Sequence, residues 1–397
     1  MPRARIVGWE RSKFGRAEEP DLEALLAGVV PAALVHAGLG AEDVDGVFLG
    51  TYNNGFCRQA FEGSIVGVAC PELAHVPATH LENACATGSA ALYAALDFLE
   101  AGRGRVAIVV GAERMTAIPT RQAGEIMLSA SYVPEEADVD GGFAGLFGQI
   151  ANGYFQANGD HSLELAMIAA KNHENDTLNP YAHMRKSVGV EFCNDVSERN
   201  PRVAGPLRRT DCALISDGAV AMVLAVPEVA DTLECGIAFR ARSQVNDVLP
   251  LSRRDPTAFA GAAGAWRKSL ETAGLNLDDI DMVETHDCFT IAELLEYEAM
   301  GLAPRGQGGR VIREGLTTRG GKLPVNPSGG LKSRGHPLGA TGVSARDRGK
   351  TARTSSHRRN RCARMSAPKV GSSRSGCLCQ GRGSRRRSAR AFGPPAT

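Results

Sequence analysis

Residues 326–342 read NPSGGLKSRGHPLGATG, and this stretch decides how the rest of the chain is interpreted. It follows a short apolar segment that ends at Val325, and Pro337 suits the first position of a helix. Glycine residues allow backbone conformations and close approaches that other residues do not. The pattern therefore predicts a strand-to-helix turn that presents the imidazole of His336 near a helix N-terminus.

A second turn of this kind contains Cys85, in the run NACATGSAALYAAL at residues 83–96. The cysteine comes just before an alanine- and leucine-rich helical pattern, and a helix N-terminus favours the thiolate over the thiol. The thiolate is the attacking species in acyl transfer, so Cys85 is a candidate nucleophile. The alternative interpretation is a small buried apolar residue, which is the usual role of a free cysteine.

A third segment, VETHDCFTIAELL at residues 283–295, carries two further candidates. An apolar strand at residues 280–283 runs into a polar turn and then into an amphipathic helix. His286 and Cys288 are two residues apart, so an extended backbone would place both side chains on one face. The three turns together offer Cys85, His286 with Cys288, and His336 for acyl chemistry.

The chain also contains an internal repeat. The sequence AGLGAEDVDGV at residues 37–47 returns as AGLNLDDIDMV at residues 273–283, and the two turns with Cys85 and His336 have a similar offset. The alternative is a chance match between two common helix–turn–strand sequences. A duplication explains both offsets, so we expect an α/β fold built from two related halves.

Through these turns and several further motifs, the chain resembles the thiolase superfamily, specifically its sterol-carrier-protein-2 type. The likeness covers about residues 4 to 344. Its motifs are GGLKSRGHP (329–337), the turn around Cys85, HDCF (286–289), KNH (171–173), NPY (179–181) and DCALISDGA (211–219). The resemblance implies a five-layer αβαβα fold from two duplicated halves, and a homodimer.

The resemblance also implies an acyl-CoA C-acyltransferase that makes or cleaves a 3-ketoacyl-CoA. In that reaction His336 takes the proton of Cys85, and the thiolate attacks the acyl-CoA. Cys288 moves the proton at Cα of acetyl-CoA, and His286 faces the enolate oxygen. Coenzyme A thioesters are the substrates, and we expect neither a permanently bound cofactor nor a metal, because the sequence lacks a P-loop, a dinucleotide fingerprint and zinc-ligand spacing.

Three other functions stay open. A ketoacyl synthase also uses one cysteine and two histidines, although Pro337 and the HDCF motif favour a thiolase. A retro-aldol lyase of the same subfamily would act on CoA esters with a small OB-fold partner, but such relatives usually lack the nucleophilic cysteine that this chain has at Cys85. The third is a catalytically impaired acyl-CoA-binding remnant.

The sequence divides into five parts. Residues 1–115 alternate strand and helix patterns as the N-terminal half, which ends with residues 205–234. Residues 116–204 lose that alternation apart from one helical pattern near 162–174, and the resemblance implies that this insertion covers the active site and supports coenzyme A. The C-terminal half is residues 235–344, and residues 345–397 form a basic tail.

Composition agrees with a large folded enzyme. The chain has 397 residues, of which 43% are apolar, so it can bury a large core. We find no membrane-spanning segment, no signal peptide and no peroxisomal tripeptide. The ten cysteines lack the spacing of a secreted disulfide framework. A cytoplasmic enzyme without a membrane partner is the expectation.

The sequence changes character at residue 345. Residues 345–397 contain 13 arginines and 2 lysines against one acid, Asp347, whereas residues 1–344 have 30 basic and 43 acidic residues. With so few large apolar residues, we expect no buried strand in the tail and interpret it as a frameshifted product. The alternative is a disordered arm that binds nucleic acid, which we do not expect. The Cys379–Gly381 string resembles an acid/base motif of many thiolases, but we assign that role to Cys288.

Overall fold

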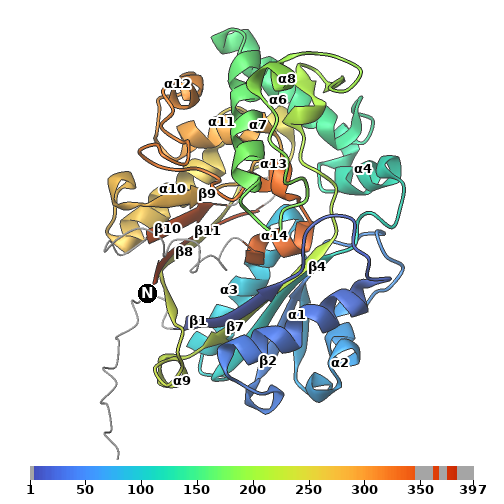
Figure 1. Cartoon of the computed structure of the whole chain (residues 1–397), viewed down its shortest axis with the longest axis vertical. Coiled ribbons are helices and arrows are strands. Elements are labelled where there is room, and N and C mark those ends of the chain that lie inside the picture. Colours follow the sequence, from blue (N-terminus) through green and yellow to red (C-terminus); the bar gives the residue numbers. More distant parts are fainter. Residues whose placement is uncertain (1–3, 345–360, 366–372, 382–397) are drawn as a thin grey trace, which may run out of the picture.

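The structure is a computed structural model, and it describes residues 4–344, 361–365 and 373–381. Nine strands form one mixed sheet that runs through the molecule (Figure 1). In the order of the sheet they are β3 (Ala78–Leu81), β2 (Gly46–Gly50), β4 (Val106–Glu113), β7 (Gly218–Ala225), β1 (Arg5–Arg11), β8 (Ile237–Asn246), β11 (Ser373–Gly381), β10 (Arg361–Met365) and β9 (Met282–Glu284). A separate short pair consists of β5 (Arg202–Ala204) and β6 (Leu207–Arg208).

The sheet has the same pairing pattern in both halves. From β1 outward, the β1–β7 and β7–β4 pairs are antiparallel and the β4–β2 pair is parallel. From β8 outward, the β8–β11 and β11–β10 pairs are antiparallel and the β10–β9 pair is parallel. The two halves meet where β1 pairs with β8 over Arg5–Ala238 and Ile6–Ile237.

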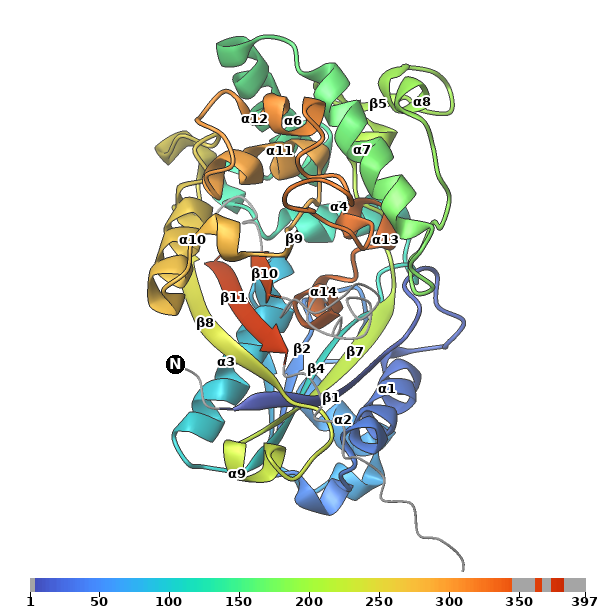
Figure 2. The ribbon, with the colours of Figure 1, turned by 60° about the vertical axis from the view of Figure 1, so that its left-hand side comes forward.

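Helices cover both faces of these strands. The helices of the two halves are α1 (Leu22–Ala37), α2 (Ile65–Ala69), α3 (Thr87–Glu100), α9 (Pro227–Ala230), α10 (Ala260–Ala273), α11 (Thr290–Ala299), α12 (Gly308–Arg313), α13 (Gly330–Arg334) and α14 (Leu338–Ser344). Helix α1 packs on β1 and β7, whereas α3 and α14 pack on β4 from the other face. Helix α3 also contacts β8, because Tyr93 and Arg242 lie against each other. Helix α10 covers the outer face of β8 and β11 (Figure 2), so the layers alternate as the five-layer fold requires.

The repeated sequence falls in equivalent elements, which confirms the predicted duplication. Helices α1 and α10 both end at a left-handed glycine, Gly38 and Gly274, with φ of 73° and 62°. Glycine is the residue that adopts this cap without steric cost. One 3-10 turn then leads into β2 and the other into β9. The repeat is therefore a shared way of ending a helix and entering the second strand of each half.

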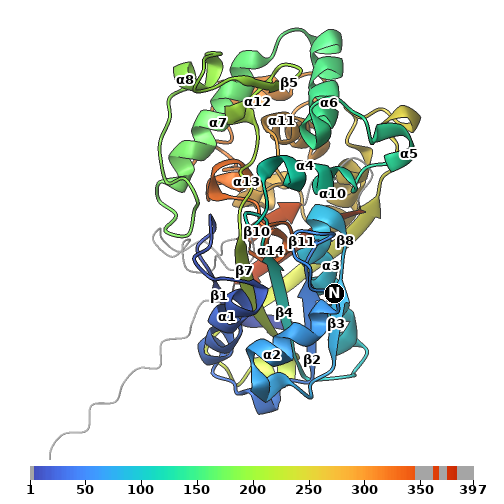
Figure 3. The same cartoon turned by 90° about the vertical axis from the view of Figure 1, so that its right-hand side faces the viewer.

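The insertion at residues 116–204 folds over one end of the molecule (Figure 3). Its helices are α4 (Thr120–Leu128), α5 (Val133–Glu136), α6 (Gly142–Asn158), α7 (Ser162–Asp176) and α8 (Val190–Asn194). The helix predicted near 162–174 is confirmed as α7, but α4 and α6 were not predicted. Glycines lower the intrinsic helix propensity of α6. Burial of its apolar side chains, among them Phe143, Phe147 and Ile150, offsets that loss.

Two details differ from the predictions. The turn before His336 is not a simple strand-to-helix turn, because Val325 makes only an isolated bridge to Val283 and the short helix α13 intervenes. Two segments of the basic tail, where no strand was predicted, pair with the sheet as β10 and β11. Residues 345–360, 366–372 and 382–397 lie outside the described residues. Among the residues that the structure describes, no helix combines the length and apolarity needed to cross a membrane.

Candidate active site

Helices α3 and α14 cross so closely that their backbones are in contact, and the crossing brings Cys85 and His336 together. A Cβ atom added to Gly88 would lie 2.4 Å from the carbonyl oxygen of Gly339. This close crossing places the two N-terminal ends side by side. The Sγ atom of Cys85 consequently lies 3.1 Å from Nε2 of His336, although the residues are 251 positions apart. Both side chains are buried, with 2% and 6% exposure.

The hydroxyl group of Thr341 sets the tautomer of His336. The Nδ1 atom of His336 lies 2.8 Å from Thr341 Oγ1, and this hydroxyl donates to the carbonyl oxygen of Pro337 at 2.8 Å. Because a hydroxyl group has one proton, Thr341 Oγ1 accepts from the Nδ1–H group. The Nε2 atom is then the acceptor that faces Cys85. In this tautomer the Nε2 lone pair of His336 points at the thiol group of Cys85.

His286 joins this pair from the other half of the sheet. Its ring lies edge-on to the ring of His336, with a centroid distance of 4.8 Å, and it is fully buried. One nitrogen of His286, one nitrogen of His336 and Cys85 Sγ all lie within 4.8 Å of one another. The structure thus brings together Cys85, His286 and His336, which were predicted as candidate site residues from three separate turns.

Cys288 faces the same small cavity as Cys85 and His336. The cavity has a volume of about 50 Å³, enough for a few water molecules. Its remaining lining is apolar, with Met127 of α4 and Phe143 of α6 on the side of the insertion. The insertion therefore supplies part of the wall of the cavity that Cys85, Cys288 and His336 line. Phe289, next to Cys288, stacks on Phe147 of α6 at 4.4 Å.

Asp287, between the two predicted residues, fastens their turn to α13. Its carboxylate accepts the backbone N–H groups of Leu331 and Lys332 at 2.6 and 3.2 Å, and the side-chain amide of Asn172 at 2.7 Å. Gly330 approaches so closely that an added Cβ atom would lie 2.1 Å from this carboxylate. Burial, with the nearby charge of Glu293, raises the pKa of Asp287 well above its usual value. Sequence reasoning assigned Asp287 no role.

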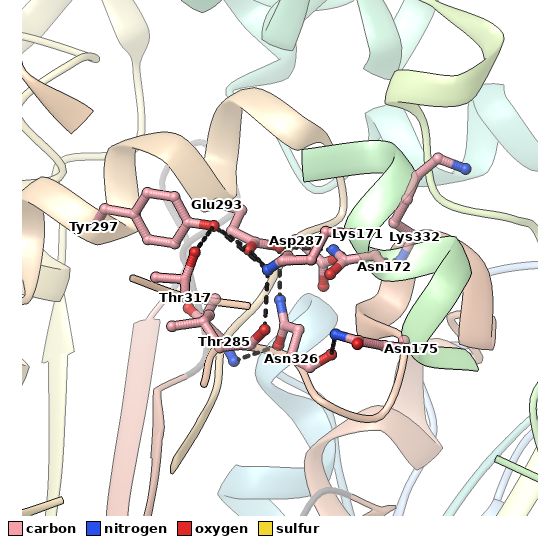
Figure 4. A network of polar contacts seen from close by, with 12 residues as sticks. Lys171, Asn172, Asn175, Thr285, Asp287, Glu293, Tyr297, Thr317, Asn326 and Lys332 are labelled. Carbon is pink, nitrogen blue, oxygen red and sulfur yellow. Dashed lines mark hydrogen bonds and ion pairs between the residues drawn. The ribbon is translucent and has the colours of Figure 1, made fainter. Parts of the chain in front are cut away.

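A buried polar network between α7, α11 and the loop at Asn326 holds the turn that carries His286 and Cys288 (Figure 4). Glu293 of α11 accepts from Asn172 at 2.7 Å and from Asn326 at 2.9 Å, and it pairs with Lys171 of α7. Asn326, held at a φ of +53°, accepts the N–H group of Thr285 at 2.8 Å. A left-handed conformation at a residue other than glycine persists only when its surroundings hold it. The network therefore fixes the backbone directly before His286.

Glu113 locks the other side of the site. This residue ends β4 and is fully buried, where it accepts the N–H groups of Tyr52, Asn53 and Gly339 at 2.9, 3.0 and 2.9 Å. Gly339 is the second residue of α14, so Glu113 joins the loop after β2 to the helix that follows His336. Burial raises the pKa of Glu113 to about 7.

Four buried charged residues were given no role from the sequence, although three of them lie in the motifs KNH and DCALISDGA. Lys171, Asp211, Asp217 and Glu293 are charged residues within otherwise apolar or motif-bearing segments, and all four are buried. Asp217, for example, accepts the N–H groups of Met115 and Thr116 at 2.7 Å each. Charged residues are rarely buried unless they are paired. Their positions in the sequence marked them as unusual, but their partners lie far along the chain.

Known proteins resemble this chain over most of its length. The family described as "Thiolase, N-terminal domain" matches residues 4–228, and the one described as "Thiolase C-terminal domain-like" matches residues 243–346. An acetyl-CoA acetyltransferase of Methanothermobacter thermautotrophicus is 34% identical over 343 residues, which cover 85% of this chain and 87% of that protein. Human sterol carrier protein 2 is 31% identical over 371 residues, which cover 86% of this chain and 64% of that protein.

A solved structure confirms the architecture. The structure named Ltp2-ChsH2(DUF35) aldolase superposes with a TM-score of 0.74 and 19% identity, covering 96% of this chain and 98% of that one. At this identity the similarity concerns the fold.

Proposed function

The chain belongs to the thiolase family, and from this premise we propose that it is an acyl-CoA C-acyltransferase that forms an acyl-Cys85 intermediate. The observation that carries the proposal is the 3.1 Å contact between Cys85 Sγ and His336 Nε2 beside a cavity that Cys288 also lines. A nucleophile within hydrogen-bond reach of an oriented base is the arrangement that covalent catalysis needs. The acetyl-CoA acetyltransferases among the relatives support acetyl-CoA as one substrate.

In the first half-reaction, Nε2 of His336 takes the thiol proton of Cys85. The thiolate attacks the thioester carbonyl of an acyl-CoA, a new C–S bond forms to Cys85, and the bond to coenzyme A breaks. The imidazolium of His336 returns its proton to the departing CoA thiolate. The backbone N–H group of Cys85 is our candidate donor to the tetrahedral oxyanion.

In the second half-reaction, the acyl group moves to carbon. Cys288 removes a proton from Cα of acetyl-CoA, and the resulting negative charge lies largely on the thioester oxygen. We assign the donor that faces this oxygen to His286. The Cα carbon attacks the acyl-Cys85 carbonyl and the C–S bond breaks. The proton that Cys288 took from Cα passes through His336 to the Cys85 thiolate, which returns Cys288 to its basic form. The products are a 3-ketoacyl-CoA and the restored enzyme, and the same steps in reverse give thiolysis.

The test is to trap the intermediate. Incubation with acetyl-CoA followed by proteolysis and mass spectrometry should place one acetyl group on the peptide that contains residue 85. Cys85→Ser should abolish the labelling. Cys288→Ala should be labelled at residue 85 but should form no 3-ketoacyl-CoA, because only the second half-reaction needs a proton transfer at Cα. Labelling at Cys288 with Cys85 unmodified would reverse the two assignments.

Aldol cleavage is the second candidate, because the solved structure of similar fold is named as an aldolase. Aldol cleavage of a 3-hydroxyacyl-CoA needs a base but no acyl-enzyme, so it gives no reason for the Cys85–His336 contact. A 3-hydroxyacyl-CoA offered without free coenzyme A distinguishes the two. Its cleavage to a carbonyl compound and an acyl-CoA, with full activity in Cys85→Ser, would favour the aldolase.

We also propose that the enzyme works as a homodimer, as the family resemblance implies. Light scattering after size-exclusion chromatography measures this directly, and a monomer at active concentrations would contradict it. The name of the structural neighbour includes a DUF35 component, which supports a small OB-fold protein as an additional partner only under the aldolase alternative.

A further inference from the structure

We propose that Cys85, His286 and His336 form a reversible Zn²⁺ site, in which metal binding takes the nucleophile and both histidines out of the reaction. One sulfur and two ring nitrogens, one from each residue, lie within 4.8 Å of one another. All three side chains are buried, with exposures of 2%, 0% and 6%. The site is defined by these positions alone and does not depend on which reaction the residues catalyse.

The distances are close to those of a zinc site. Zn–N bonds of about 2.05 Å and Zn–S bonds of about 2.3 Å in a tetrahedron give ligand–ligand edges of roughly 3.3 to 3.6 Å. The Cys85–His336 edge is 3.1 Å, so it needs to open only slightly. The other two edges are at most 4.8 Å, so a side-chain movement of about 1 Å by His286 closes them.

The chemistry of the ligands favours zinc over harder cations. One thiolate with two neutral imidazoles is a soft-to-borderline donor set, which suits Zn²⁺ and not Mg²⁺ or Ca²⁺. His336 also has the second partner that metal-bound histidines usually have, since its Nδ1–H group is held by Thr341 at 2.8 Å. The Nε2 lone pair is thereby already directed at the position that a metal beside Cys85 Sγ would occupy.

The surroundings leave room for a fourth ligand. The cavity of about 50 Å³ beside Cys85 and His336 accommodates a water molecule, and three protein ligands with one open position is the usual pattern of accessible zinc sites. Binding replaces the thiol proton of Cys85 by the metal: the S–H bond breaks, the proton goes to solvent, and an S–Zn bond forms without any change of oxidation state. The bound thiolate and the bound Nε2 atom can then neither attack a thioester nor accept a proton.

Metal titration of the full chain tests the site without any measurement of activity. Co²⁺ substitutes for Zn²⁺ in tetrahedral sites, and a Co²⁺–thiolate bond gives a near-ultraviolet charge-transfer band. The wild-type protein should bind one Co²⁺ with this band, and Zn²⁺ should displace it. Cys85→Ser should abolish the band, and His286→Ala should weaken zinc binding by about a hundredfold or more, since loss of an outer-shell partner alone costs 10- to 100-fold.

Matched variants separate this site from adventitious binding. Cys288→Ala, in the same cavity, should keep both the band and the zinc affinity, and so should Cys193→Ser, a buried cysteine elsewhere. Thr341→Val should lower the affinity by about 10- to 100-fold, and Thr341→Ser should restore it. A band that persists in Cys85→Ser, or an affinity unchanged in His286→Ala, would overturn the proposal.

A second measurement needs only the wild-type protein. Stoichiometric Zn²⁺ should slow alkylation of Cys85 by iodoacetamide, mapped by mass spectrometry, and a chelator should restore the rate. Alkylation of the half-buried Cys57 should not change. Equal alkylation of Cys85 with and without bound zinc would show that the metal lies elsewhere. Failure to acetylate Cys85 with acetyl-CoA would count against the thiolase reaction and leave this result unaffected.

Discussion

At the scale of single residues, one hydroxyl group determines how His336 can act. The hydroxyl group of Thr341 donates its proton to the carbonyl oxygen of Pro337 and therefore accepts the Nδ1–H group of His336. The unprotonated Nε2 atom then faces Cys85. The sequence places Thr341 five residues after His336, one helical turn along α14, so this contact is local. It was nevertheless not predicted, because the same spacing suits a threonine that bonds only to the backbone of its own helix.

Glu113 gives a prediction about pH and stability. Its pKa is raised from 4.5 to about 7 by burial, so the folded state holds its proton more tightly than the unfolded state does. This contribution to stability is complete below pH 4.5 and is lost as the pH rises through 7. Glu113→Gln removes this titrating group. Between pH 4.5 and pH 7 the free energy of unfolding of the wild type should therefore decrease by about 3 kcal/mol more than that of Glu113→Gln.

Urea unfolding of both proteins at pH 5 and pH 7.5 measures this difference. Glu228→Gln, an exposed glutamate at the start of α9, is the control and should follow the wild type at both pH values. The same pH dependence in Glu113→Gln as in the wild type would show that the buried carboxyl does not titrate in this range.

At the scale of elements, the two half-reactions depend on different supports. Asp287 ties the turn with His286 and Cys288 to α13, whereas Thr341 and Glu113 hold His336 and α14. In Asp287→Asn, an amide N–H₂ group replaces one carboxylate oxygen that accepts N–H groups. Two donors then face each other, so the turn with His286 and Cys288 should move away from α13. We expect ketoacyl-CoA formation to fall by about 100-fold, as for a displacement of about 1 Å, with less effect on acylation of Cys85.

Thr341→Val should show the opposite pattern. Acylation of Cys85, followed by the burst of coenzyme A release, should slow by about 10- to 100-fold because the tautomer of His336 is no longer fixed. Thr341→Ser should restore the rate. Equal losses of both half-reactions in Asp287→Asn and in Thr341→Val would show that the two supports are not separate.

The turns and the layered fold were predictable from the sequence, whereas the helices of the insertion and the buried polar network were not. Cys85, His286, Cys288 and His336 were identified because glycine-rich turns, apolar strands and helix starts are local patterns. The helices α4 and α6 and the network of Glu293 were missed because they depend on tertiary partners: α6 packs against α4, β5 and α11, and Glu293 bonds to Asn172 across 121 residues. A pattern of neighbouring residues in the sequence does not indicate which distant residues will contact them in the fold.

The crossing of α3 and α14 gives a second prediction at this scale. A Cβ atom on Gly88 would lie 2.4 Å from Gly339 O, so Gly88→Ala should lower stability by about 1–3 kcal/mol and should also impair acylation of Cys85. Gly28→Ala in α1, where no atom lies within 4 Å of the added Cβ, should instead stabilise by about 0.5–1 kcal/mol. Thermal unfolding of the two variants compares the same substitution in two helices.

At the scale of the whole molecule, the two halves share a strand pattern, but their strands differ in composition. β4 is apolar up to its last residue, Glu113, and β7 is apolar throughout. β10 and β11, which hold the matching places in the other half, come from the basic tail. The C-terminal family match ends at residue 346, where the tail begins. We predict that resequencing the DNA for residues 340–397 will reveal a shifted reading frame, and that restoring the frame will raise activity. An unchanged reading would show that the tail is the native sequence.

Truncation separates the two roles of the tail. Stopping the chain after Ser344 removes both β11 and β10 from between β8 and β9 and exposes the edges of those two strands, so this protein should aggregate. Stopping after Gly381 keeps both strands and removes five arginines, so it should remain folded. Equal solubility of the two truncated chains would mean that β10 and β11 contribute nothing to the sheet.

The truncation after Gly381, compared with the full chain, also tests for a nucleic-acid partner. Arginine-rich arms bind phosphate backbones by releasing counterions, which makes their affinity fall steeply with salt. Here the tail has a net charge of +14, and residues 1–344 have a net charge of −13 that competes for it within the molecule. We therefore expect weak binding of duplex DNA and of RNA by the full chain, little changed after Gly381 truncation. Tight, salt-sensitive binding that truncation abolishes would show that residues 382–397 are a genuine nucleic-acid arm, which a frameshifted sequence would acquire only by chance.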